Sequence, residues 1–170
     1  MAKLIQQMLR EAILTNPERI AIEKAPDTFI TYKELHNRAG KIASYLKKQG
    51  LMPGKGIPVA ILMEQDTPYI EAMVACMLFG YSAVLLNKTY PKERCDYVVG
   101  DSGARIILEE KNIVEAYQDD TVCDSVRVEP DTSAIIVYTS GSTGKPKGVV
   151  INHKSVTACA AWYIKDLKLD

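Results

Sequence analysis

The chain has 170 residues, the length of one ordinary domain or of a piece of a larger one. Its apolar fraction of 47% is enough to build a buried core, which excludes a disordered protein. Because 21 basic residues balance 21 acidic residues, the total charge gives no indication of binding to nucleic acid or to an anionic membrane.

The first third of the chain predicts helices around two short strands. Apolar residues at helical spacing indicate an amphipathic helix that ends before Asn16-Pro17, and extended segments follow at 19–23 and 28–31. Thr31 and Glu34 have the spacing of a capping box, which starts a helix that we expect to end near Gly50.

The remainder alternates between short apolar strands and helices. Strands are predicted at 57–62, 83–86, 105–108, 134–138 and 147–151, and an edge strand at 122–128. Helices are predicted after a Thr67 N-cap at 68–80, and at 91–99, 111–117 and 155–167. This alternation predicts an α/β fold with a mainly parallel sheet flanked by helices.

Cysteines and apolar runs indicate the compartment. Four cysteines form no C-x-x-C motif, and two histidines are too few to complete a metal site with them, so no metal site is predicted. All four are interpreted as buried or partly buried thiols in a reducing compartment. With no signal peptide and no apolar run near the ~20 residues that span a bilayer, a cytoplasmic protein without a membrane segment is expected.

The segment from Tyr138 to Val150, YTSGSTGKPKGVV, carries the main indication of function. Glycines expose backbone N–H groups, hydroxyl side chains donate hydrogen bonds, and Lys145 and Lys147 supply positive charge. These groups suit an oxygen-rich anion such as a polyphosphate. The alternative interpretation is a surface turn that only links two strands.

A P-loop does not account for this segment. The motif G-x-x-x-x-G-K-[ST] needs glycine where Thr139 stands, and a hydroxyl residue where Pro146 follows Lys145. Pro146 also favours an extended conformation for Lys145 rather than the start of a helix.

The same segment resembles the phosphate-loop signature of the adenylate-forming enzyme superfamily. Its leading Tyr138 resembles the branch that contains the amino-acid adenylation domains of nonribosomal peptide synthetases. Segments 29–39, 78–94 and 101–102 resemble further stretches of those domains in the right order, although Phe79, Leu85 and Asn87 depart from the usual pattern. The resemblance implies that residues 1–170 are the N-terminal portion of the large subdomain of an adenylation domain.

The resemblance also implies an activity. Family members use ATP with Mg²⁺ to convert an amino acid or another carboxylate into an acyl-adenylate plus pyrophosphate. The acyl group then passes to the phosphopantetheine thiol of a peptidyl or acyl carrier protein. No nucleic acid or membrane takes part.

Site residues are carried over only onto matching positions. The implied phosphate loop comprises Thr139, Ser140, Gly141, Ser142, Thr143, Gly144, Lys145 and Lys147. The two lysines either touch ATP or stabilise the loop. His153 is either a strand-end or surface imidazole or a group near the phosphates.

Stretches that resemble the later family motifs, which hold magnesium, ribose and the substrate carboxylate, are absent from these 170 residues. We therefore expect no adenylation by this chain alone and assign no catalytic residue within it. Two alternatives remain: a piece of an acyl- or aryl-CoA ligase, or a naturally short, non-catalytic protein that binds a nucleotide or a partner.

Overall fold

The computed structural model describes residues 3–25, 28–124, 126–140 and 145–167. The helices are α1 (Ile5–Thr15), α2 (Tyr32–Lys48), α3 (Thr67–Phe79), α4 (Lys92–Ser102), α5 (Glu110–Tyr117) and α6 (His153–Asp166). The strands are β1 (Ile20–Ala25), β2 (Thr28–Thr31), β3 (Pro58–Ile61), β4 (Ser82–Leu85), β5 (Ile107–Leu108), β6 (Ser133–Thr139) and β7 (Lys147–Asn152).

Five strands form the main sheet in the order β5-β3-β4-β6-β7. The first four run parallel, and β7 joins β6 in an antiparallel hairpin at the edge. Strands β1 and β2 form a separate antiparallel ribbon. The predicted α/β fold with a mainly parallel sheet is confirmed.

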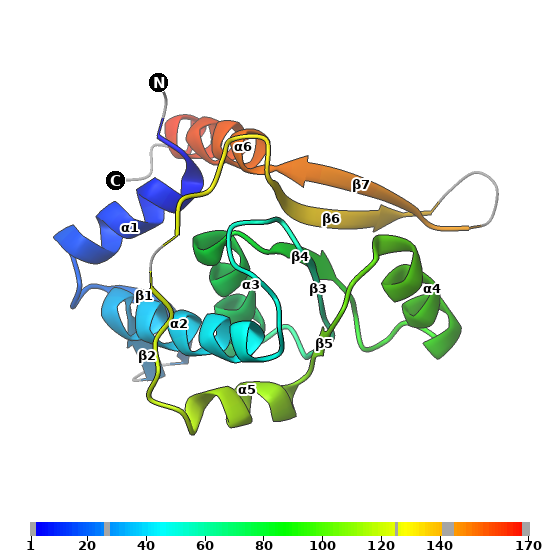
Figure 1. Cartoon of the computed structure of the whole chain (residues 1–170). Coiled ribbons are helices and arrows are strands. Elements are labelled where there is room, and N and C mark those ends of the chain that lie inside the picture. The colour runs from blue at the N-terminus through cyan, green and yellow to red at the C-terminus, as the bar shows by residue number, and fades with distance from the viewer. Residues whose placement is uncertain (1–2, 26–27, 125, 141–144, 168–170) are drawn as a thin grey trace.

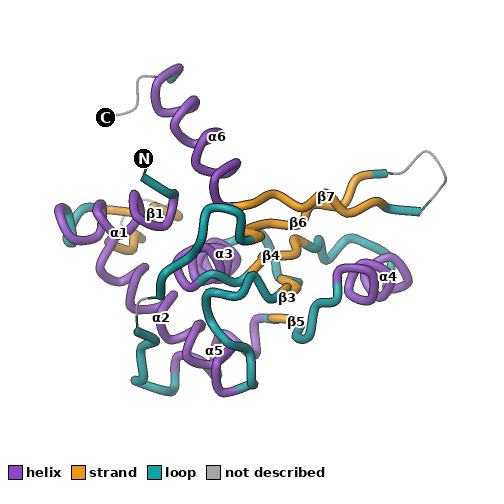
Figure 2. The backbone as a smooth tube through the Cα atoms, turned by 45° about the horizontal axis from the view of Figure 1, so that its top comes forward, coloured by secondary structure: helices purple, strands orange, loops and turns teal. Residues whose placement is uncertain are grey.

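Helices lie on both faces of the sheet, with more of them on one face than on the other (Figures 1 and 2). The larger core lies between α2, α3 and α5 and one face, and contains Val59 and Ile61 of β3. On the other face, Ala60 of β3 packs in a smaller core under α4. Because β3 is covered on both sides, its residues are apolar without alternation, as expected for a central parallel strand.

Local signals place α2 and α3. The capping box of α2 is present: the Glu34 N–H donates to the Thr31 hydroxyl at 3.2 Å, and the Thr31 N–H donates to the Glu34 carboxylate at 2.8 Å. The predicted cap of α3 is one residue off, because the Asp66 carboxylate, not Thr67, accepts from the first-turn N–H. Gly80 ends α3 at φ 68°, where an added Cβ would come within 2.7 Å of the Gly54 Cα.

The edge strand predicted at 122–128 is wrong: its described residues form no ladder. Their backbone groups instead bond to helices. The Cys123 N–H donates to the Gly40 carbonyl at 3.1 Å, and the Val126 carbonyl accepts from Gln6 and Arg10 side chains. These partners satisfy the backbone without a neighbouring strand.

The cysteines are all free thiols. Cys76 and Cys95 are buried, and Cys123 is partly buried, as predicted. Cys159 is exposed, contrary to the prediction, because α6 buries only His153 and Thr157 among its described residues. In the described part of the chain, no helix is both long and apolar enough to cross a membrane.

Candidate functional site

The Gly- and hydroxyl-rich segment lies at the far end of the β6–β7 hairpin. Figure 1 shows this hairpin extending from the sheet above α4. Thr139 pairs with Lys147 as the last pair of the hairpin, and residues 140–146 connect the two strands. The strands predicted at 134–138 and 147–151 are therefore confirmed.

Strand pairing brings two predicted site residues together. Directly opposite residues of an antiparallel pair share one face, so Thr139 and Lys147 project to the same side of the hairpin. Both are exposed, as are Ser140 and Lys145. The remaining predicted loop residues, Gly141, Ser142, Thr143 and Gly144, lie outside the described residues.

The described part of the chain offers no acidic partner to the lysines at the end of the hairpin. Among the residues that the structure describes, no carboxylate forms an ion pair with Lys145 or Lys147. Lys92 at the start of α4, by contrast, pairs with Asp96 at 2.6 Å. Two exposed ammonium groups beside exposed hydroxyls fit an anionic, oxygen-rich ligand from outside the chain.

Tyr138 occupies the opposite face of β6 and contacts α4. Its hydroxyl donates to the Asp101 carboxylate at 2.7 Å. Burial, and then this hydrogen bond, raise the pKa of Tyr138, so its hydroxyl remains protonated and remains a donor. Its ring crosses Gly148 on β7, where an added Cβ would lie 3.0 Å from the ring.

Helix α4 is held firmly beneath this contact. Cys95 and Val98 pack against the sheet, and the guanidinium of Arg94 lies 4.1 Å from the ring centroid of Tyr90. Gly103 ends the helix in the left-handed conformation, just after Asp101 and Ser102. The carboxylate that receives the Tyr138 hydroxyl thus comes from a packed element.

His153 lies at the other end of β7 from the connection. It is the first residue of α6 and is completely buried, and neither ring nitrogen has a hydrogen-bond partner among the residues that the structure describes. Burial lowers the pKa of His153, so the imidazole is neutral in the folded protein. At about 3.3 Å per residue, the six residues of β7 put roughly 20 Å between His153 and the connection.

Sequence reasoning missed the partnership of Tyr138 with Asp101 and Gly148. Asp101 and Tyr138 are 37 positions apart, which hides the contact from any local pattern. One signal was available: an aspartate in the last turn of a helix sits at the negative end of the helix dipole, where acidic residues are disfavoured.

Candidate metal ligands do not gather in the described part of the chain. Its residues contain no group of three His, Cys, Asp or Glu side chains that could hold a metal ion.

Two solved structures have the same fold as this chain. The N-terminal subdomain of Klebsiella oxytoca NpsA, in complex with anthranilyl-AMSN, aligns with a TM-score of 0.81 and 29% identity. O-succinylbenzoate coenzyme A synthetase (MenE) from Bacillus subtilis, in complex with ATP and magnesium ion, aligns with a TM-score of 0.82 and 26% identity. The alignments cover 92% and 95% of this chain but only 43% and 47% of those chains.

Two synthases are among the sequence relatives of this chain. Gramicidin S synthase 2 from Brevibacillus brevis is 34% identical over 93% of this chain and 4% of its own length. A mycosubtilin synthase from Bacillus subtilis is 30% identical over 99% of this chain and 7% of its own length. The family profile described as AMP-binding enzyme matches residues 9–169, so the chain belongs to the AMP-binding enzyme family. The predicted adenylate-forming superfamily is confirmed.

Proposed function

We propose that residues 1–170 form the N-terminal part of the large subdomain of a nonribosomal peptide synthetase adenylation domain. Family membership and the identities of 34% and 30% to peptide synthetases support this assignment. The chain spans a small share of those relatives, so the remaining walls of the site would come from further sequence.

The proposed reaction joins a carboxylate to ATP. An oxygen of the amino-acid carboxylate attacks the α-phosphorus, the bond from that phosphorus to the bridging oxygen breaks, and pyrophosphate leaves. The phosphopantetheine thiol of a carrier protein then attacks the acyl carbon, a thioester forms, and AMP leaves. Mg²⁺ bound to the ATP phosphates would neutralise part of their charge.

In this reaction the hairpin binds phosphate oxygens. The hydroxyls of Thr139 and Ser140 donate hydrogen bonds to them, and Lys145 and Lys147 balance their charge. The observation that carries this proposal is the pairing of Thr139 with Lys147 at a hairpin end whose lysines have no carboxylate partner among the described residues. Gly141, Ser142, Thr143 and Gly144 are proposed to continue the same phosphate loop.

Exposed apolar surface supports the proposal that further polypeptide completes the domain. Val149 and Val150 on the edge strand β7 are 48% and 63% exposed, and Trp162 on α6 is 57% exposed. Large apolar side chains left this exposed on an edge strand and on the helix that follows it are compatible with cover by further polypeptide. Because the chain is only part of the proposed domain, we expect it to show only background pyrophosphate exchange by itself. We also propose that the complete enzyme acts in the cytoplasm.

Nucleotide titration tests the phosphate-binding role. Calorimetry should detect Mg·ATP binding to the chain, with Lys147→Met weakening it about tenfold, or about 1.4 kcal/mol, because one charge-assisted contact is lost. AMP binding should be unchanged by Lys147→Met, since AMP lacks the β- and γ-phosphates.

Lys154→Met is the matched control, because Lys154 is an exposed lysine that pairs with Asp131 at the start of α6. It should bind Mg·ATP like the parent chain. Equal loss in both lysine variants, or no detectable binding of ATP by the parent chain, would contradict the proposal.

A coenzyme A ligase is the second candidate, favoured by the TM-score of 0.82 to MenE. The higher identity to peptide synthetases favours amino-acid activation instead. Offering coenzyme A and a phosphopantetheinylated carrier protein to the complete enzyme separates the two candidates, since only the true acceptor yields a thioester.

A further inference from the structure

Tyr138 joins the hairpin to the body of the molecule close to the end of β6. Ile136, two positions earlier on the same face, is buried in the core under α4. Beyond it, Val137 and Thr139 on β6 and Lys147 to Val150 on β7 are exposed. Tyr138, by contrast, is partly buried, and its hydroxyl reaches Asp101 of α4.

Two features indicate that this contact is specific. Asp101 lies in the last turn of α4, where the helix dipole disfavours a carboxylate, and the Tyr138 hydroxyl donates to it at 2.7 Å. Gly148 leaves room for the ring, since any Cβ there would lie 3.0 Å from ring carbon Cζ and 3.1 Å from the hydroxyl oxygen. Three residues from α4, β6 and β7 therefore meet at one contact.

The contact lies one residue from the predicted phosphate-binding pair. Tyr138 pairs with Gly148, and the next pair is Thr139 with Lys147 on the opposite face. A hydrogen bond that holds Tyr138 against α4 therefore also fixes the direction in which Thr139 and Lys147 project. Positioning of this kind matters because displacements of about 1 Å at a binding site reduce its function strongly.

We propose that Tyr138 and Asp101 are positioning residues that hold the end of the β6–β7 hairpin against α4 and orient Thr139 and Lys147 toward nucleotide phosphates. Gly148 permits this arrangement by leaving space for the Tyr138 ring. The inference rests on the proposed nucleotide binding and deepens it, since neither Tyr138 nor Asp101 needs to touch the nucleotide.

The molecule contains a matched pair for comparison. On the other side of the sheet, the hydroxyl of Tyr117 in α5 donates to the buried carboxylate of Glu71 in α3. This pair also joins a tyrosine to an acidic residue across two elements, but it lies in the large helical layer and not beside the hairpin. Its loss should affect stability alone.

The test measures Mg·ATP affinity and the melting temperature on the full 170-residue chain. Tyr138→Phe and Asp101→Ala should each weaken Mg·ATP binding about fivefold, and the double variant should be no weaker than either single one. Asp101→Asn keeps an acceptor oxygen and should recover most of the affinity. Tyr117→Phe should lower the melting temperature and leave the affinity unchanged.

Hydrogen exchange supplies a second readout without nucleotide. The amides of Thr139 and Lys147 should exchange faster in Tyr138→Phe and Asp101→Ala than in the parent chain, and at parent rates in Tyr117→Phe. Asp101 is exposed, so its variants test the inference even if Tyr138→Phe folds poorly.

The outcomes separate the two proposals. If the parent chain binds Mg·ATP but the Tyr138 and Asp101 variants bind it equally well, the positioning inference is wrong and the nucleotide site stands. If the parent chain does not bind Mg·ATP, the proposed function fails, and the inference that depends on it fails with it. Additive losses in the double variant would also overturn the positioning pair.

Discussion

Two ion pairs of the helical body differ from the lysines at the end of the β6–β7 hairpin. In the body, Arg38 pairs with the buried Glu71 at 2.9 Å, and Lys41 pairs with Asp120 at 2.8 Å. At the hairpin end, Lys145 and Lys147 have no such partner among the described residues. The comparison teaches that these two ion pairs join elements of the body to one another, whereas Lys145 and Lys147 remain available to an outside anion.

The largest loss of stability is expected from a substitution in the core of the helical body. Leu46 on α2 is fully buried, and Leu46→Ala should lower the free energy of unfolding by about 3 kcal/mol, through lost burial and the cavity left behind. Urea denaturation measures it. Leu14→Ala is the control, since Leu14 is 81% exposed and its loss should change stability by under about 0.5 kcal/mol. If both variants changed the free energy of unfolding by similar amounts, the assignment of Leu46 to the core would be wrong.

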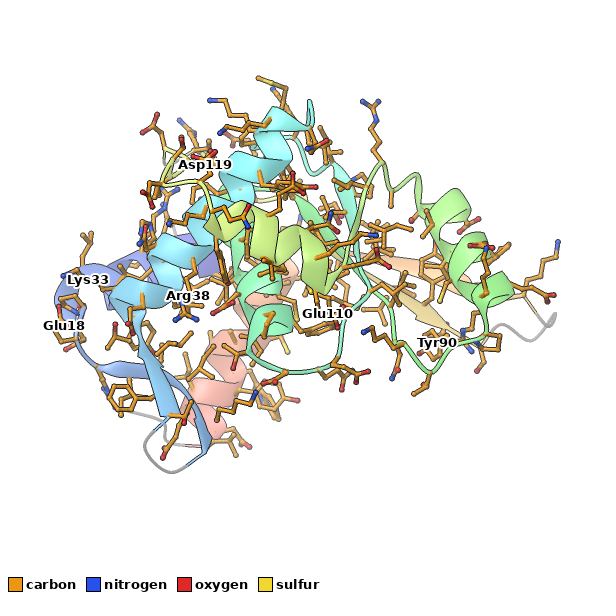
Figure 3. All side chains as sticks on the ribbon, turned by 90° about the horizontal axis from the view of Figure 1, so that it is seen from below. Glu18, Lys33, Arg38, Tyr90, Glu110 and Asp119 are labelled. Carbon is orange, nitrogen blue, oxygen red and sulfur yellow. The ribbon has the colours of Figure 1, made fainter. Side chains whose placement is uncertain are left out.

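A smaller loss should follow when the buried ion pair is broken. Glu71→Gln leaves the Arg38 guanidinium without its counter-charge and should cost about 2 kcal/mol of unfolding free energy, because Glu71 is only 1% exposed. The matched control is Glu18→Gln, since Glu18 is 74% exposed and lies 3.5 Å from Lys33 at the molecular surface (Figure 3). A surface pair of this kind contributes little, so thermal melting should separate the two variants.

Acid should destabilise the body through its two histidines. Burial lowers the pKa of His153, and burial followed by repulsion from Arg10 lowers that of His36. The unfolded chain takes up these protons near pH 6.5 while the folded chain resists them, so stability is lost as the pH falls below about 6.5. The loss should reach at most about 1.4 kcal/mol per pH unit for each histidine.

Unfolding measured between pH 7.5 and pH 5 checks this acid dependence. His153→Leu should reduce the dependence of the unfolding free energy on pH, and His36→Asn should reduce it independently. A curve in the double variant as steep as that of the parent chain would show that neither imidazole is the cause.

The smallest effect is expected on the hairpin. Val149 pairs with Val137 on the exposed face, so Val149→Thr should change the free energy of unfolding by less than about 0.5 kcal/mol. Chemical denaturation is again the measurement. A loss near that of Leu46→Ala would mean that the hairpin contributes to the core, which would remove the distinction between the two regions.

Much of the fold was predictable because its signals are local. The capping box of Thr31 and Glu34, the glycine that ends α3, and the apolar strand β3 depend on neighbours in sequence. The missing strand at 122–128 was not predictable, because its backbone partners lie on α1 and α2, more than 80 positions away.

Part of the candidate site was predictable from local sequence, and part of it depends on tertiary packing. The donors and lysines of the loop are visible in thirteen consecutive residues, and the pairing of Thr139 with Lys147 follows from a hairpin. The Tyr138–Asp101 hydrogen bond depends on how α4 packs under the sheet, which no local pattern specifies. The exposure of Cys159 likewise depends on which face of α6 is covered.

Amide chemical-shift mapping of the ¹⁵N-labelled chain during Mg·ATP titration tests the central claim most directly. The phosphate-binding hairpin predicts that the largest shifts fall on Thr139, Ser140, Lys145 and Lys147, and that the amides of α2, α3 and α5 stay unchanged. Shifts concentrated in the helical body, with the hairpin amides unmoved, would contradict the account.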